Sequence, residues 1–230
     1  AVVLALASTA ASAEITANGA VSNNYLWRGL TQTSDLPSIS GGIDWASESG
    51  LYAGTWVSNV DYSGGNGPFS YEHDLYVGFA TDSYDIGLLY YNYDEETRYD
   101  FAEIYGSVGF SGFTLGAYVL VWADVRTLGT GQDYDPGTAY YVYADYGFEL
   151  ANGMAVGLHV GMHDGDFSDS FNFGIGDVAN ELDPYYDYSL SLGVGDFTFT
   201  VSDTTIGAGV GGNNSREKFV VSYGTEFGLQ

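Results

Sequence analysis

The sequence contains no cysteine and very few positive charges. Among 230 residues there are 5 Lys and Arg against 30 Asp and Glu, which gives a formal net charge of −25. Without cysteine the chain can form neither a disulfide scaffold nor a thiolate-ligated metal site. Nucleic acid is excluded as a partner, because binding phosphate groups requires a basic patch that so few cations cannot supply.

Long hydrophobic runs are also missing, since no apolar segment reaches the roughly 20 residues that a transmembrane helix requires. The chain has instead 33 glycines, 21 tyrosines and an apolar content of 45%. Glycine is therefore at roughly twice its average usage of about 7%. A chain this rich in apolar and aromatic residues collapses, which excludes disorder. The composition is typical of an acidic β protein.

The first thirteen residues, AVVLALASTAASA, have the pattern of a secretory signal peptide. An apolar stretch is followed by small residues that end at Ala11-Ser12-Ala13, immediately before Glu14. A short N-terminal helix is the alternative interpretation. We expect residues 1–13 to be the remnant of the signal peptide and residues 14–230 to form one exported domain.

From Glu14 onward the dominant pattern is alternation of apolar and polar residues, and not a helical stripe. Leu190 and Leu192, for example, alternate with Ser189 and Ser191, as expected for a strand with one face buried and one solvated. Such runs predict twelve strands, near 15–27, 38–46, 51–60, 69–80, 84–93, 101–110, 113–123, 139–148, 154–163, 186–195, 197–203 and 218–227.

Short and long connections alternate between the predicted strands. The short ones are tight hairpin turns such as Ser111-Gly112. The long ones are 28–37, 61–68, 94–100, 124–138, 164–185 and 204–217. A soluble β-sandwich, the alternative, has no reason to sort its loops by length. We therefore predict an all-β, up-and-down antiparallel transmembrane barrel of about twelve strands, with short periplasmic turns and long extracellular loops.

Aromatic residues near the predicted strand ends agree with a membrane location, because Tyr and Trp form girdles at membrane–water interfaces. The residues that we assign to these girdles are Tyr25, Trp27, Trp45, Tyr52, Tyr84 and Tyr188.

Several blocks of the sequence resemble the TorF-type porin family. The specific ones are SNNYLWRGLTQT at 22–33, ISGGIDW at 39–45 and GLYAGTWVSNV at 50–60, and YYVYADY at 140–146 and YYDY at 185–188 are similar to later blocks. The resemblance implies a barrel of porin type in the outer membrane of a Gram-negative bacterium, surrounded by outer-membrane lipid.

The alternation assigns a set of polar residues to the lumen. We expect the pore to be lined by Arg28, Asp44, Glu72, Asp74, Glu103, His159, His163 and Lys218. Four carboxylates in a narrow lumen attract cations and repel anions, so we expect a passive, cation-preferring channel for small solutes, with Arg28 as the counter-charge. Alternatively, these groups form an ion-pair network that closes a small barrel.

The long loops hold most of the remaining negative charge. Asp164, Asp166 and Asp169 begin like an EF-hand loop, but the sixth position is Asp169 where glycine is needed, and the twelfth is Ile175 where Glu is needed. A solvated acidic loop is the simpler interpretation. We expect no cofactor apart from Ca²⁺ as a candidate ligand of these loops. A plugged barrel with such loops would be a structural or surface-interaction protein, and homo-oligomers are compatible with either function.

Catalytic motifs are lacking, since the sequence has no Gly-x-Ser-x-Gly, no His-Glu-x-x-His and no phosphate-binding loop. His159 and His163 lie four residues apart on a predicted strand, about 13 Å at the usual rise, which is too far to share one zinc ion. We expect that the protein is not an enzyme.

Overall fold

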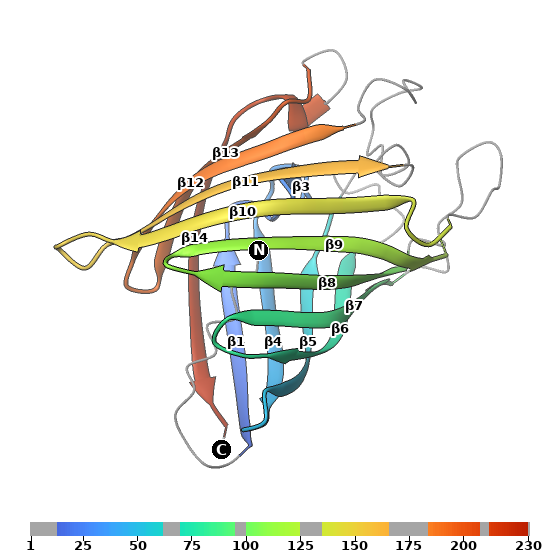
Figure 1. Cartoon of the computed structure of the whole chain (residues 1–230). Coiled ribbons are helices and arrows are strands. Elements are labelled where there is room, and N and C mark those ends of the chain that lie inside the picture. Colours follow the sequence, from blue (N-terminus) through green and yellow to red (C-terminus); the bar gives the residue numbers. More distant parts are fainter. Residues whose placement is uncertain are drawn as a thin grey trace.

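The protein is a closed antiparallel barrel of twelve strands (Figure 1). The computed structural model describes residues 13–61, 70–94, 100–124, 135–165, 184–207 and 212–229. The barrel strands are β1 (Glu14–Ser22), β4 (Ser38–Ala46), β5 (Leu51–Asn59), β6 (Tyr71–Ala80), β7 (Tyr84–Tyr93), β8 (Phe101–Phe110), β9 (Phe113–Ala123), β10 (Ala139–Glu149), β11 (Ala155–Gly165), β12 (Tyr185–Val194), β13 (Phe197–Thr204) and β14 (Lys218–Gly228). A separate hairpin comprises β2 (Leu26–Trp27) and β3 (Leu30–Thr31), and a 3-10 helix spans Gly212–Ser215.

The predicted up-and-down topology is confirmed. Each barrel strand pairs with the barrel strands before and after it in the chain, and β1 closes the barrel by pairing with β14. All the short turns lie at one end, which we call the short-turn end, and the strand ends that the longer connections join lie at the other, the long-loop end (Figure 1). Closure leaves no unpaired strand edge, as a membrane-spanning sheet requires.

One of the short turns shows how the sequence dictates a hairpin. Ser111 and Gly112, between β8 and β9, have φ angles of 47° and 83°. Two consecutive residues with positive φ form the type of two-residue turn whose twist matches the twist of paired strands. The turn therefore joins the two strands without a longer loop.

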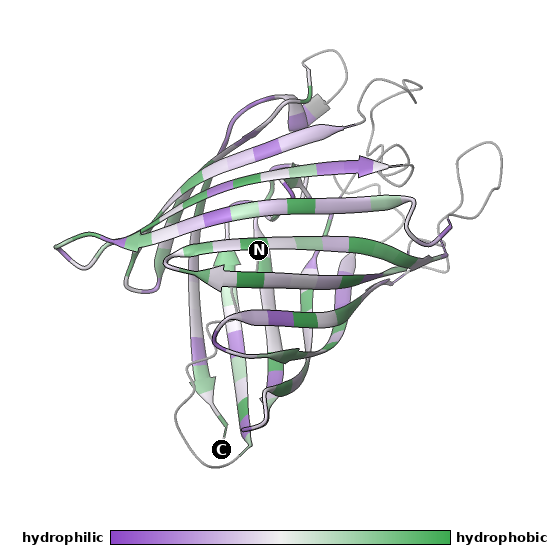
Figure 2. Cartoon of the chain, viewed as in Figure 1, coloured by the Kyte–Doolittle hydropathy of each residue, from purple (hydrophilic) through white to green (hydrophobic). Residues whose placement is uncertain are grey.

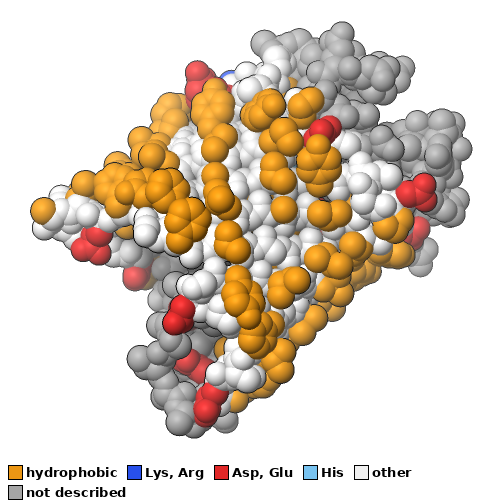
Figure 3. Space-filling view, in the orientation of Figure 1, with side chains coloured by type: hydrophobic (Ala, Val, Ile, Leu, Met, Phe, Trp, Pro, Cys, Tyr) orange, Lys and Arg blue, Asp and Glu red, His pale blue; other side chains and the backbone are white. Residues whose placement is uncertain are grey.

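Apolar side chains cover the outside of the barrel. Leu75, Val77 and Ile86 point outward and have 48%, 52% and 54% of their surface exposed. Figure 2 shows the alternation along each strand, and Figure 3 shows hydrophobic side chains spread over the outer face, with carboxylates mostly toward its ends. Such an exterior is that of a transmembrane barrel. Within the described part of the chain, no helix is long and apolar enough to cross a membrane.

The predicted aromatic girdles are only half correct. Trp45, Tyr84 and Tyr188 do lie on the outer face and are exposed. Tyr52 points into the lumen and is only 5% exposed, because its position in β5 has inward parity. Tyr25 and Trp27 are not on the barrel wall at all, for the reason given next.

The prediction of one strand over 15–27 is wrong, because β1 ends at Ser22. Residues 23–37, which we call the tongue, leave the wall and fold into the lumen, so the predicted extracellular loop 28–37 is largely buried. Thr33 is fully buried and Gln32 is 2% exposed. At the point of departure, the side-chain oxygen of Asn24 accepts hydrogen bonds from the hydroxyls of Thr31 (2.6 Å) and Thr33 (3.1 Å). Such local bonds compete with strand pairing.

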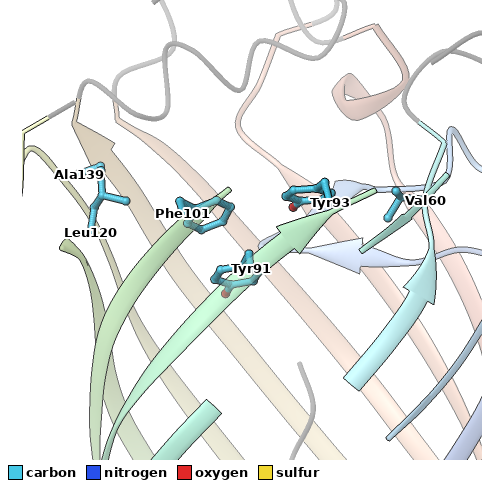
Figure 4. Close-up of a cluster of buried hydrophobic side chains, with 6 residues drawn as sticks. All are labelled: Val60, Tyr91, Tyr93, Phe101, Leu120 and Ala139. Atoms are coloured by element: carbon cyan, nitrogen blue, oxygen red, sulfur yellow. The ribbon is translucent and has the colours of Figure 1, made fainter. Parts of the chain in front are cut away.

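The hydrophobic core lies inside the long-loop half of the barrel. Its larger cluster consists of Val60, Tyr91, Tyr93, Phe101, Leu120 and Ala139 (Figure 4), and a second cluster consists of Leu30, Tyr185 and Ile206. Tyr25 and Trp27 of the tongue pack against the larger cluster. The tongue therefore provides apolar contacts that a barrel with an open lumen would lack.

A bulge in β9 changes the faces of its last residues. Ala102 pairs with Trp122 and Glu103 with Leu120, so Val121 is the extra residue. A β-bulge places two residues opposite one and reverses the alternation beyond it. Leu120, before the bulge, shares the inward parity of Tyr118 and is fully buried, whereas Trp122, beyond it, faces outward and is 47% exposed.

Candidate functional site

The tip of the tongue is a two-residue turn formed by Arg28 and Gly29. Trp27 pairs with Leu30 across it, and the φ angles of Arg28 and Gly29 are 49° and 79°. A Cβ on Gly29 would lie 2.6 Å from Cβ of Asp187 and 2.7 Å from Cγ2 of Thr204. Glycine is therefore needed both for the turn and for the close approach to β12 and β13.

Arg28 lies in a pocket of opposite charge and aromatic faces. Its Nη2 is 2.5 Å from Oε2 of Glu103, and the two side chains are 5% and 2% exposed. Its Cζ lies 4.2 Å from the ring centre of Trp27, 4.6 Å from that of Tyr141 and 5.0 Å from that of Tyr118. These are distances of cation–π contacts. Arg28, which we expected to line the pore, thus lies on the tongue tip and not on a barrel strand.

Further hydrogen bonds fix the tip to opposite walls. Tyr91 of β7 donates to Glu103 (3.3 Å) and lies 3.4 Å from the indole nitrogen of Trp27. Tyr185 of β12 donates to the backbone carbonyl of Arg28 (3.2 Å). The tongue therefore spans the lumen from β7 and β8 to β12.

His163, on β11, completes the surroundings of Arg28 and is only 1% exposed. Its Nε2 lies 3.4 Å from Nη1 of Arg28, and its Nδ1 lies 3.3 Å from the hydroxyl of Tyr185. Because a guanidinium is permanently charged and can only donate, the imidazole nitrogen that faces it acts as the acceptor.

Two predicted carboxylates lie side by side on the inner face of β6 but differ in their partners. Glu72, 1% exposed, accepts hydrogen bonds of 2.7 Å from both Tyr25 and Tyr93. Asp74 is 8% exposed, and its Oδ1 is buried without a hydrogen-bond partner in the described structure. A buried polar oxygen without a partner is costly, so Asp74 marks a place where a cation or a hydrogen-bond donor would be stabilised.

The base of the tongue is held by Lys218 of β14. Its Nζ lies 2.5 Å from Oδ1 of Asp35, and Asn24 donates to the same oxygen (2.9 Å). Lys218 is 4% exposed. This predicted lumenal cation is therefore paired with the tongue and adds no free positive charge to the lumen.

His159 lies between two carboxylates on the inner face. Its Nδ1 is 2.6 Å from Asp145 and its Nε2 is 3.0 Å from Asp187. The hydroxyl of Tyr141 lies 2.8 Å from the same Nε2. Both ring nitrogens of His159, on β11, are therefore bound to neighbouring side chains, so that His159 links β11 to β10 and β12. Asp44, the last predicted lumenal acid, is 8% exposed and bonds Asn18 (3.0 Å) and Tyr76.

The inner wall also carries a regular packing of tyrosines on glycines. Each pair joins neighbouring strands, and a Cβ added to the glycine would collide with the ring. The pairs are Tyr76 on Gly54, Tyr52 on Gly78, Tyr105 on Gly87, Tyr143 on Gly116 and Tyr141 on Gly161. Tyrosines without such space would have to project into the lumen, so these glycines hold the rings against the wall.

Sequence reasoning missed five members of this site, namely Trp27, Asp35, Tyr118, Tyr141 and Asp187. Three of them carried a usable signal, because Tyr118, Tyr141 and Asp187 share the inward parity of their strands. Trp27 and Asp35 lie on the tongue, where no alternation applies.

The candidate calcium ligands do not form a site in the described structure. Asp164 lies on β11, not in the following loop, and its Oδ2 accepts a 2.6 Å hydrogen bond from Tyr140. Asp166 and Asp169 lie outside the described residues, as does the predicted signal segment up to residue 12. Within the described ranges no group of three or more His, Cys, Asp or Glu could hold a metal ion. Calcium binding stays a prediction.

A model of the bacterial family Gcw_chp, described as proteins of unknown function, matches residues 6–194. The chain belongs to this family. Membership of this family does not indicate a function, and the resemblance to the TorF-type porins stays a prediction. None of the curated proteins matches the sequence.

Solved porin structures are loosely similar to this Gcw_chp member. A mutant of Rh. blastica porin has 14% identity and a TM-score of 0.44 over 83% of this chain. This chain spans only 55% of that porin. KdgM porin has 8% identity and a TM-score of 0.45, covering 94% of this chain and 99% of its own. Pseudomonas aeruginosa OprD has 14% identity and a TM-score of 0.42, covering 95% and 67% respectively.

Proposed function

We propose that this protein is a narrow outer-membrane channel of a Gram-negative bacterium, through which small solutes diffuse passively with a preference for cations. The observation that carries the proposal is the contrast between the two faces of the closed barrel. Outward side chains are mostly apolar, whereas the charged groups of the wall, such as Glu72, Glu103 and Lys218, lie inside beside the hydrophobic core. Charged and polar groups inside an outer-membrane barrel are typical of a channel through which solutes pass.

The preference for cations rests on the balance of paired and unpaired charges. Among the described residues, Arg28 and Lys218 are each paired with a carboxylate. Glu72 accepts hydrogen bonds from two tyrosines, and Oδ1 of Asp74 has no hydrogen-bond partner. Within the described chain, no Lys or Arg lies within ion-pair distance of either carboxylate. The lumen therefore carries net negative charge, which concentrates cations and repels anions.

A specific observation favours a second function, a plugged barrel that acts as a structural or surface-interaction protein. The tongue lies across the lumen, and inward residues around it, such as Leu120, His163 and Lys218, are buried. The two functions differ in whether the tongue leaves a path for ions. That the protein is not an enzyme stays a prediction, and homo-oligomers stay compatible with either function.

Single-channel recording of the refolded protein in a planar bilayer under a KCl gradient tests the proposal. We expect small discrete steps with a reversal potential that favours K⁺, and larger steps for Arg28→Ala, which frees the tongue tip. Arg216→Ala is the matched control, because it removes the same charge from a side chain that is 65% exposed. Folded barrels of wild type and Arg28→Ala that are both silent would contradict the channel and favour the plugged barrel.

A further inference from the structure

The structure assigns a binding site for guanidinium compounds to the inner wall, at the place that the tongue now fills with Arg28. We define the guanidinium cage as Glu103, Tyr118 and Tyr141, on the consecutive strands β8, β9 and β10. The inference deepens the proposed function, on which it rests, by naming small guanidinium-bearing solutes as the class that the lumen recognises.

The chemistry of the cage matches a planar cation. Glu103 offers carboxylate oxygens to the N–H groups, and Tyr118 and Tyr141 offer aromatic faces within 5.0 Å of the guanidinium carbon. A guanidinium combines fork-shaped donors with a flat, weakly hydrated surface that stacks on rings, which an ammonium ion lacks. The cage is therefore built for guanidinium more than for simple alkali ions.

The cage belongs to the wall, whereas its present occupant does not. Tyr118 and Tyr141 are paired directly across β9 and β10, and Glu103 and Leu120 are paired across β8 and β9. Arg28 lies on the tongue, whose tip holds no barrel pairing. Its φ of 49° is in the left-handed region that non-glycine residues rarely adopt. Such strain persists only where the surroundings hold the residue in place.

The aromatic side of the cage is fixed before any ligand arrives. The ring of Tyr141 packs on Gly161 and that of Tyr143 on Gly116, where the absence of a side chain leaves room for the ring. The ring centre of Tyr118 is 6.4 Å from that of Tyr141 and 6.1 Å from that of Tyr143. A site that is already ordered loses less entropy when it binds, which raises its affinity.

Asp74 provides an independent sign that a cation belongs here. Its Oδ1 is buried and lacks a hydrogen-bond partner, and Asp74 is paired across β6 and β7 with Tyr91, whose hydroxyl donates to Glu103. With Arg28 in place, Glu103 is satisfied and Asp74 is not. A solute that carries an amine beside its guanidinium group could satisfy both carboxylates, so we expect it to bind more tightly than guanidinium alone.

Chemical rescue of Arg28→Ala tests the inference, with guanidinium chloride at millimolar concentration as the probe. We expect the variant to melt at a lower temperature than wild type, and guanidinium to raise its melting temperature and reduce its channel current. Urea has the same shape without the charge and should do neither. Agmatine, which adds an amine, should act at lower concentration. In wild type and Arg216→Ala the probe must first displace Arg28 from Glu103, so they should respond only at much higher concentrations.

Two further variants separate the cage from a general effect of the cation. Arg28→Ala combined with Tyr118→Leu should bind guanidinium about tenfold more weakly, the magnitude of one lost cation–π contact. Arg28→Ala combined with Tyr223→Leu, which removes an outward tyrosine, should be rescued as well as Arg28→Ala alone. Equal rescue in both double variants, or rescue by urea, would overturn the cage.

The outcomes also distinguish this inference from the proposed function. If Arg28→Ala conducts but guanidinium changes neither its current nor its melting temperature, the channel stands and the cage is wrong. If no variant conducts but guanidinium stabilises Arg28→Ala, the cage stands and the channel is wrong. Should Arg28→Ala fail to refold without ligand, refolding yield with and without guanidinium gives the same answer, since a ligand that binds only the folded barrel raises the yield.

Discussion

The two halves of the barrel lumen are filled in different ways. In the long-loop half, the inward residues Glu72, Phe101, Leu120 and His163 are almost completely buried, because the tongue packs on them. In the short-turn half, Asp44 and Tyr52 are buried too, but most inward residues are only half-buried, among them Ser107, Tyr143, Asp145, Ser191 and Thr200. One half therefore resembles the core of a soluble protein, and the other resembles the wall of a water-filled vestibule.

This difference teaches that a barrel of this size can divide two tasks between its ends. Specific contacts with long side chains and paired charges are concentrated where the tongue enters. Small residues and tyrosines held flat against glycines keep the other half open. Any selectivity should therefore arise in the long-loop half, and substitutions in the two halves should have different consequences.

Glu103→Gln is expected to have the largest effect. It leaves the buried guanidinium of Arg28 without its counter-ion, and breaking a buried ion pair in this way costs about 3–5 kcal/mol. The variant should unfold at a lower temperature in detergent and conduct more than wild type. Glu149→Gln, at the exposed short-turn end of β10, is the control. If the two variants have equal stability, the tongue does not stabilise the long-loop half.

Gly116→Ala tests the tyrosine packing, with a smaller expected effect. The added Cβ would collide with the ring of Tyr143, and overpacking of this kind costs about 1–3 kcal/mol. Gly147→Ala is matched to it, because a Cβ there meets only a backbone oxygen at 3.9 Å. Thermal unfolding of both variants measures the difference. If Gly147→Ala lowers the stability as much as Gly116→Ala, the packing of Tyr143 on Gly116 does not contribute to stability.

Asp74→Asn should stabilise the protein. A buried carboxyl oxygen without a partner carries a desolvation penalty of about 1–3 kcal/mol. We expect the variant to gain only about 1 kcal/mol of folding stability, because the new amide also needs hydrogen-bond partners. The same variant should lower the preference for K⁺ in the reversal potential. A loss of stability would show that Asp74 holds a bound cation or water that the amide cannot replace.

Asp94→Asn is expected to have the smallest effect, because Asp94 lies at the exposed rim just beyond β7. Partial burial raises the pKa of Asp94, but hydrogen bonds from the Ser70 hydroxyl and from the amides of Ser70 and Tyr71 outweigh it, so the pKa is below its ordinary value. A carboxylate with a depressed pKa stabilises the fold above its unfolded-state pKa and loses that contribution as the pH falls. Unfolding midpoints near neutral pH should fall by an amount equivalent to about 0.5–1 kcal/mol, and the difference from wild type should vanish in acid.

The sequence predicted the barrel well because alternation and hairpin turns are local. The predicted strands 38–46, 84–93 and 101–110 agree with β4, β7 and β8 at both ends. The inward parity of Asp44, Glu72 and Glu103 followed from the same alternation. Nothing beyond neighbouring residues was needed for either result.

The tongue and the guanidinium cage could not be predicted in this way. Tyr25 and Trp27 continue the alternation of β1, so the pattern gives no sign that the strand ends at Ser22. The contacts that draw the tongue inward join Arg28 to Glu103 and His163, which are 75 and 135 residues away. The bulge at Val121 is equally invisible, because it depends on which residues of β8 and β9 pair.

The position of the tongue in the chain also sets an order of events during folding. It follows β1 directly, yet its anchoring residues are distributed over strands that come much later, as far as β14. Contacts between residues so far apart form only after the intervening chain has been brought together. We therefore expect the contacts of the tongue with β12 and β14 to form late in folding, after the intervening strands have paired. A probe attached beside the tongue, inside the lumen, should become protected later than the hydrogen-bonded amides of the barrel strands.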